Sequence, residues 1–276
     1  MATTRRIFLR YITSGIMALA TGTGLMKFAT GETAEKVVSK LVSDNSTFPW
    51  TVKKVAEYYR DPPPVEGVRY AMAIDTQACI GCRRCMYACI KENNTGRKSG
   101  IQYIRLLEME ESSFDLLNSD PYYTEAPQED KWYLPAHCNQ CEKPSCVQAC
   151  PVTATWQEDD GIVVIDYNKC IGCRFCMVNC PYGARKFNWV KNEVPEDEIN
   201  PDVPIRPIGV VEKCTFCIHR TRKGLKPRCE VVCPVGARKF GDIHDPDSEI
   251  SNLLRTRRVT VLKEDMGNEP QVYYVG

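Results

Sequence analysis

The spacing of its cysteines constrains this chain more than any other feature of the sequence. All 16 cysteines fall into four groups of four, and none is left over. Two groups have the spacing C-x2-C-x2-C-x3-C, and the other two contain an insertion in one gap. In chain order, runs one to four consist of Cys79, Cys82, Cys85 and Cys89; Cys138, Cys141, Cys146 and Cys150; Cys170, Cys173, Cys176 and Cys180; and Cys214, Cys217, Cys229 and Cys233.

A cubane iron–sulfur cluster accounts for this spacing, because it needs four thiolates at the corners of a tetrahedron. A tight loop with three cysteines wraps three irons, and a fourth cysteine arrives from elsewhere. In the bacterial ferredoxin run C-x2-C-x2-C-x3-C-P, the last cysteine ligates the neighbouring cluster. The runs therefore predict four [4Fe–4S] clusters with all 16 cysteines as ligands, and hence a path for electrons.

Two other uses of cysteine compete with this interpretation. A disulfide framework is usual for cysteine-dense exported chains, but such scaffolds are short and do not repeat one loop geometry four times. Structural zinc sites use paired C-x2-C knuckles separated by a long gap. Runs two and four alone could form such knuckles, whereas the three evenly spaced cysteines of runs one and three fit zinc poorly.

The crossover of the last cysteine predicts which ligands share a cluster. Runs two and three are close in sequence and are expected to form one two-cluster module, and runs one and four the other, so that one module is inserted in the other. The expected fold class is α+β, with two nested modules of the bacterial ferredoxin type. The predicted clusters are Cys79/Cys82/Cys85/Cys233, Cys214/Cys217/Cys229/Cys89, Cys138/Cys141/Cys146/Cys180 and Cys170/Cys173/Cys176/Cys150.

Residues outside the runs indicate no catalytic site. The formal net charge is +1, so no nucleic acid partner is expected. Because the cysteines complete every ligand set, neither His137 nor His219 is needed as a ligand. We expect both to form hydrogen bonds to sulfides or carbonyls, and the alternative is a role toward protons or quinone. We expect His244 in a surface turn. No Ser/His/Asp set, phosphate loop or pair of catalytic carboxylates stands out, so the chemistry belongs to the cofactors and the chain is a non-catalytic subunit.

The N-terminus predicts export. Thr4–Arg10, with the sequence TRRIFLR, is similar to the twin-arginine signal and precedes an uncharged segment, 11–26. This route carries proteins that load cofactors before export, which would protect the thiols from oxidation. We expect a location at the extracytoplasmic face of the cytoplasmic membrane, either peripheral or anchored by an uncleaved signal. The alternatives are a cleaved signal and a basic N-terminus without a role in export.

The rest of the chain is organised around the runs. β-Branched segments at 68–75, 132–136, 161–166 and 208–212 predict a strand before each run. The sequence CPYGARKF at 180–187 recurs as CPVGARKF at 233–240. The expected parts are a signal or anchor at 1–34, a lead-in at 35–67, module one at 68–130 and 208–246 with an acidic surface insertion at 106–130, module two at 131–207, and a C-terminal β-hairpin extension at 247–276.

The four runs, together with the insertion in run four and the sequence CTFCIHR at 214–220, resemble a known family. It comprises the four-cluster electron-transfer subunits of molybdopterin oxidoreductases and related respiratory complexes. The signal is similar to those of exported subunits in nitrite-reduction, tetrathionate or sulfite-reduction-associated complexes. The resemblance implies a polytopic quinone-interacting membrane subunit as partner, with a multihaem cytochrome or a molybdopterin catalytic subunit as a further one. The alternatives are a free soluble multi-cluster ferredoxin and a cluster-bearing sensor or scaffold.

Overall fold

The computed structural model describes residues 62–276 except 112 and 117. The predicted export signal or anchor at 1–34 and most of the predicted lead-in at 35–67 lie outside these residues. Within the described part of the chain, no helix is long and apolar enough to cross a membrane.

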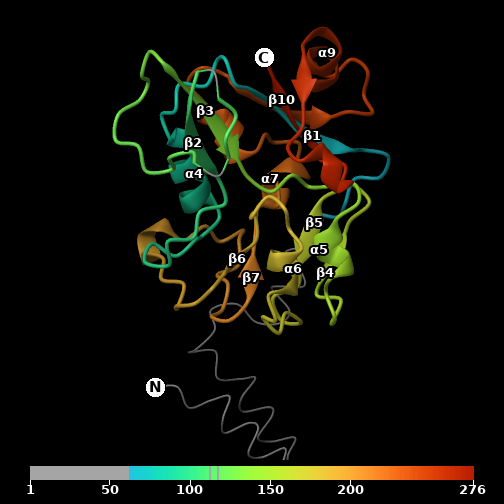
Figure 1. Ribbon diagram of the computed structural model, residues 1–276. Coiled ribbons are helices and arrows are strands. Elements are labelled where there is room, and N and C mark those ends of the chain that lie inside the picture. Colours follow the sequence, from blue (N-terminus) through green and yellow to red (C-terminus); the bar gives the residue numbers. More distant parts are fainter. Residues whose placement is uncertain (1–61, 112, 117) are drawn as a thin grey trace, which may run out of the picture. The chain divides into compact units, whose positions relative to one another are not determined.

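The largest sheet joins segments from both ends of the described chain. Its strand order is β8–β1–β10–β9. The second strand, β1 (Tyr70–Asp75), is parallel to β10 (Val272–Val275) and antiparallel to β8 (Arg238–Asp242). At the sheet edge, β9 (Val259–Thr260) pairs antiparallel with β10. Strand β1 therefore lies beside strands that follow it by more than 150 residues, as Figure 1 shows by the contrast of blue and red ribbons.

The two faces of β1 pack against different parts of the molecule. Ala71 and Ala73 face helix α9 (Glu249–Thr256) and pack with the buried Ile250. Met72 and Ile74 belong to the main core, which also contains many of the cysteines. Alternation along the strand thus separates a small satellite core from the interior that holds the candidate ligands.

Three two-stranded sheets complete the strand content of the described residues, and one strand of each precedes a cysteine run. They pair β2 (Arg105–Glu110) with β3 (Lys131–Ala136), β4 (Thr155–Gln157) with β5 (Val163–Ile165), and β6 (Lys186–Phe187) with β7 (Val211–Glu212). Strands β1, β3, β5 and β7 lead into runs one to four in turn. The predicted strand before each run is therefore confirmed.

A short helix accompanies each run. Helix α4 (Arg84–Glu92) follows the loop of run one, α5 (Ser145–Gln148) and α6 (Phe175–Val178) belong to runs two and three, and α7 (Ile218–Thr221) and α8 (Arg228–Val231) belong to run four. Only α4 exceeds one turn among these five, and Cys89 within it is followed by Ile90, whereas a proline follows the last cysteine of each other run. Two 3-10 turns lie at Glu196–Glu198 and Glu264–Met266.

Part of the predicted acidic surface insertion is a core strand, so that prediction was wrong for its first residues. Leu106, Leu107 and Met109 of β2 are buried, while the acidic residues between and after them are more exposed. The apolar side chains thus cause this segment to be buried as a strand despite its acidic residues. The predicted C-terminal hairpin is present as the antiparallel pair β9–β10, but β10 also pairs with β1 and so joins the extension to the main sheet.

Candidate iron–sulfur cluster sites

The loops of runs one and three have the same backbone conformation. Gly81 and Gly172 both have φ of +68°, a left-handed conformation that favours glycine. Both positions are also crowded, because a Cβ at Gly81 would clash with the Tyr133 ring and one at Gly172 with the carbonyl oxygen of Gly209. The repeated sequence therefore forms a repeated loop, and its glycines let the backbone curl where no side chain fits.

The first candidate site, here called site A, lies between run one and the end of run four. Its cavity is lined by the thiol-bearing residues Cys79, Cys82, Cys85 and Cys233. The packing of β1 with β8 and of α4 with α8 brings these distant segments together. Cys82 is exposed, so site A approaches the surface.

Site B is the most deeply buried. Cys89, Cys214, Cys217 and Cys229 line a cavity, together with His137 and apolar neighbours that include Met72, Ile104 and Phe216. Three of its cysteines are buried. The amide nitrogen Nδ2 of Asn93 lies 3.5 Å from Sγ of Cys89 and 3.8 Å from Sγ of Cys217. A side-chain donor thus faces two of the sulfurs at once.

Site C belongs to run two and the end of run three. Its cavity is lined by Cys138, Cys141, Cys146 and Cys180. For site D, the remaining cysteines are Cys150, Cys170, Cys173 and Cys176. Cys150 follows α5 and Cys176 lies within α6, and these two helices are in contact. The structure therefore brings together four predicted ligands at each of A, B and C, and brings the elements of site D side by side.

The buried thiols fit a cluster whose iron atoms supply the positive charge that thiolate ligands need. Burial raises the pKa of Cys79 to about 11 and that of Cys141 to about 12. Thiols of the same set add to the effect, since Cys138, Cys146 and Cys180 all raise the pKa of Cys141. Across the described residues, no three His, Cys, Asp or Glu side chains converge closely enough to hold a single metal ion. At each of sites A, B and C, four thiols surround one cavity, which suits a polynuclear group.

The sites are neighbours in the order A, B, C and D. Burial is the largest cause of the raised pKa of Cys229, and Cys85 of site A adds to it. Cys138 of site C likewise raises the pKa of Cys214 of site B, beyond the effect of burial. Burial and then Cys146 of site C contribute to the raised pKa of Cys176 in site D. Site B thus lies next to sites A and C, and site D lies next to site C.

The three histidines differ in their surroundings. Nδ1 of the buried His137 lies 2.8 Å from the carbonyl oxygen of Cys138, as expected of a carbonyl partner. Nε2 of His219 lies 2.9 Å from the Glu92 carboxylate, a partner that the sequence did not predict. The exposed His244 lies at a bend, with Nδ1 3.2 Å from the carbonyl oxygen of Gly67.

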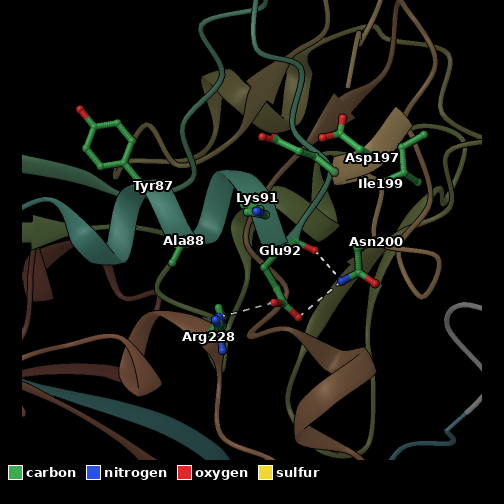
Figure 2. Close-up of a pocket in the computed structure, with 9 residues that line it drawn as sticks. Tyr87, Ala88, Lys91, Glu92, Asp197, Ile199, Asn200 and Arg228 are labelled. Atoms are coloured by element: carbon green, nitrogen blue, oxygen red, sulfur yellow. Dashed lines mark hydrogen bonds and ion pairs between the residues drawn. The ribbon is translucent and has the colours of Figure 1, made fainter. Parts of the chain in front are cut away.

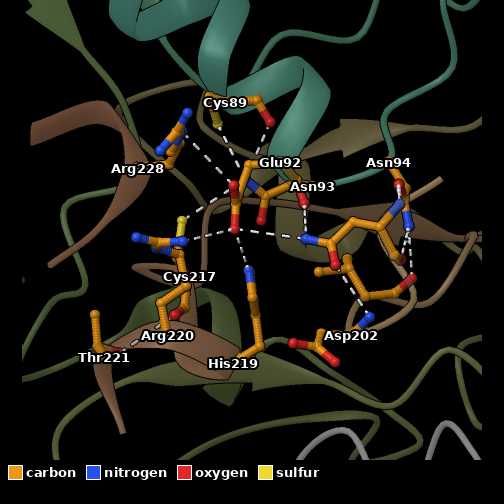
Figure 3. Close-up of polar contacts among 12 residues, drawn as sticks. Cys89, Glu92, Asn93, Asn94, Asp202, Cys217, His219, Arg220, Thr221 and Arg228 are labelled. Atoms are coloured by element: carbon orange, nitrogen blue, oxygen red, sulfur yellow. Dashed lines mark hydrogen bonds and ion pairs between the residues drawn. The ribbon is translucent and has the colours of Figure 1, made fainter. Parts of the chain in front are cut away.

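Glu92 organises a polar network beside site B that the sequence analysis missed. Its carboxylate contacts His219, Arg220 and Arg228, as Figure 3 shows. Burial opposes its ionisation, but these partners together lower the pKa of Glu92. An open pocket adjoins the network, lined by residues that include Tyr87, Lys91, Glu92, Asn200 and Arg228 (Figure 2).

Basic residues between Cys217 and Cys229 pair with carboxylates of the same chain. Arg222 forms an ion pair of 2.7 Å with Asp160, and both side chains are fully buried. Lys226 pairs with Glu230 at 2.5 Å. The charges of this insertion thus hold the loop against its own chain.

Several known proteins are similar to this chain in sequence. Residues 130–196 and 169–248 each match a family described as a 4Fe-4S dicluster domain. The chain is 44% identical over 207 residues to a putative dimethyl sulfoxide reductase iron-sulfur subunit of Halobacterium salinarum, covering 75% of this chain and 78% of the relative. It is 35% identical to a selenate reductase subunit of Mesobacillus selenatarsenatis, covering 99% and 97%. It is 40% identical to the menaquinone reductase iron-sulfur cluster-binding subunit of Nitratidesulfovibrio vulgaris, covering 75% and 89%.

Proposed function

Because this chain belongs to the family of iron–sulfur electron-transfer subunits of respiratory oxidoreductase complexes, we propose that its 16 cysteines hold four [4Fe–4S] clusters in the row A, B, C, D. Electrons pass along this row between partners that meet its two ends. The observation that carries the proposal is the set of three separate cavities, each lined by four cysteines from two distant segments.

When bound, the clusters supply one-electron redox chemistry, and the chain supplies positions and surroundings. Its cysteines fix the four sites, and the apolar residues around site B exclude water from the middle of the row. Asn93 directs an N–H donor at two sulfurs of site B. Hydrogen bonds to the sulfurs and burial are among the means by which proteins set cluster potentials.

We further propose that the ligands cross over within two nested modules. Contacts of α4 with α8, and of α5 with α6, support the pairing of run one with run four and of run two with run three. The two matches to dicluster families overlap in run three, so their limits do not coincide with these modules. The nested arrangement accounts for the cysteines that line sites A and B, which belong to module one, and for those that line site C.

The partners proposed for the two ends are a quinone-interacting membrane subunit and a redox partner or catalytic subunit. The names of two relatives support the first, since they are a menaquinone reductase subunit and an Hdr-like menaquinol oxidoreductase subunit. The names of selenate and tetrathionate reductase subunits support the second. Next to site D, exposed apolar side chains offer a contact surface: Ile171, Phe175, Val178 and Trp189.

We also propose export by the twin-arginine route, on the sequence of residues 4–10. Replacing Arg5 and Arg6 by lysine should leave the loaded protein in the cytoplasm, and unchanged export would refute this part. Purification of the native protein tests the complex. Recovery with a membrane subunit supports it, whereas a soluble monomer with all its iron would favour a free multi-cluster ferredoxin.

Iron analysis of the purified holoprotein tests the proposed function itself. We expect iron and sulfide contents that correspond to four cubane clusters, together with electron paramagnetic resonance signals that appear on reduction. A protein with the iron of only two clusters, or with zinc in their place, would contradict it.

A further inference from the structure

Two arginines occupy equivalent positions in the internal repeat, five residues after a cysteine of a candidate site. Arg185 follows Cys180, and Arg238 follows Cys233. Arginine is among the residue types that are almost never fully buried unless paired. Yet Arg185 is 3% exposed and Arg238 is 1% exposed. The same sequence segment therefore buries one guanidinium group in each proposed module.

Arg185 lies between sites C and D. It lines the cavity of site C, and Nη2 lies 3.0 Å from Sγ of Cys146. The same nitrogen donates a hydrogen bond of 2.9 Å to Oγ1 of Thr155, which holds the side chain in place. The guanidinium also interacts electrostatically with Cys138 of site C and Cys176 of site D.

Arg238 stands in the same relation to sites A and B. It lines the cavity of site A and interacts electrostatically with Cys79 and Cys85 of that site and with Cys229 of site B. Its Nη1 lies 3.3 Å from Sδ of Met72 on the neighbouring strand β1. Each arginine thus faces thiols of two sites rather than one.

Neither guanidinium has a carboxylate partner among the ion pairs of residues 62–276 that the structure describes. In that part of the chain, Nη2 of Arg238 and both Nε and Nη1 of Arg185 are buried without a hydrogen-bond acceptor. A buried charge that lacks a counter-charge is costly. A cubane cluster with four thiolate ligands carries net negative charge and presents sulfide acceptors, so it supplies what these donors lack.

We propose that Arg185 and Arg238 are inter-cluster cations, each of which raises the reduction potentials of both clusters in its module. This inference rests on the proposed ligand sets. A guanidinium stays protonated in proteins, so its charge is constant while an electron leaves one cluster and arrives at the next. No proton moves. A fixed positive charge between two sites stabilises the added electron on either one, so it raises both potentials.

The test is a potentiometric titration of the purified holoprotein, followed by electron paramagnetic resonance, for R185M and R238M. We expect each variant to lower two of the four potentials by at least about 59 mV, a tenfold change for a one-electron couple, and to leave the other two unchanged. R185K and R238K keep the positive charge, so their potentials should stay close to those of the wild-type protein. The matched control is K239M, because Lys239 adjoins Arg238 but pairs with Glu249 at 2.6 Å.

Four unchanged potentials in fully loaded R185M and R238M would overturn the inference, as would a shift of the same pair of clusters by both variants. If the methionine variants lose iron, the lysine variants decide. Iron retained by lysine and lost by methionine supports a need for the charge, whereas iron lost from both shows a structural role and refutes the inference. A wild-type protein without four clusters would instead refute the proposed function.

Discussion

The two ends of the row share a loop sequence but differ in what covers them. Run one has CIGCRRC and run three has CIGCRFC. At site A, Arg83 stacks on Tyr123 at 3.8 Å, and the hydroxyl of Tyr123 donates a hydrogen bond of 2.5 Å to the carbonyl oxygen of Gly81. At site D, the corresponding Arg174 lies 4.8 Å from Trp189, which is 65% exposed.

This difference shows that the loop and its accessibility have separate origins. The glycine and cysteine positions determine the loop, and they are the same in both runs. The covering of Arg83 comes from a segment 40 residues away in sequence, which supplies Tyr123. At site D the corresponding Arg174 lies over Phe187 and the exposed Trp189, and Ile171 and Phe175 remain more than half exposed. At site A the chain thus caps the loop at Gly81 and Arg83 while Cys82 stays exposed, whereas site D presents apolar side chains suited to a partner.

Removal of iron should have the largest effect, because both ends depend on it. Chelation under oxidising conditions leaves Arg185 and Arg238 buried without counter-charge, at a cost of several kcal/mol for each ion. The cysteines also lose the bonds that tie distant segments together. We expect the circular dichroism spectrum to lose most of its secondary-structure signal. A spectrum unchanged after complete iron loss would refute this dependence.

Opening the capped end should have a smaller but clear effect. In Y123A, the loss of a buried aromatic ring should lower the free energy of unfolding by about 3 kcal/mol. Y123F keeps the ring and removes only the hydrogen bond to Gly81, so its cost should be about 1 kcal/mol. Urea unfolding of the loaded proteins measures both. An equal decrease in the free energy of unfolding for the two variants would show that packing of the Tyr123 ring does not stabilise the loop at Gly81.

At the open end, truncation of the aromatic side chain should scarcely change stability. Trp189 is largely exposed, so W189A should alter the free energy of unfolding by no more than about 0.5 kcal/mol. It should nevertheless weaken association with native membranes, measured by co-sedimentation of loaded protein. Y122A is the matched control, since Tyr122 is also exposed but belongs to the segment at the capped end. Equal binding by W189A and wild type would contradict a docking role for this face.

The comparison also shows how far the sequence could predict the structure. Cysteine spacing and β-branched runs were sufficient for the loops and for a strand before each of them, because both are local. The covering of Gly81 by Tyr123 and the pairing of β1 with β10 depend on contacts between distant segments. The acidic residues of β2 led to the prediction of a surface segment, although the apolar residues between them are buried. The shared role of Arg185 and Arg238 emerges only when the cavities are seen.

The central claim is that ligands cross over between runs, and C233S tests it most directly. Electron paramagnetic resonance of the reduced protein should show the loss of one cluster signal, the same one that C82S removes. The signal removed by C217S should remain, because Cys217 belongs to site B. If C233S and C217S instead remove the same signal, Cys233 serves the cluster of its own run, and the nested row of sites is wrong.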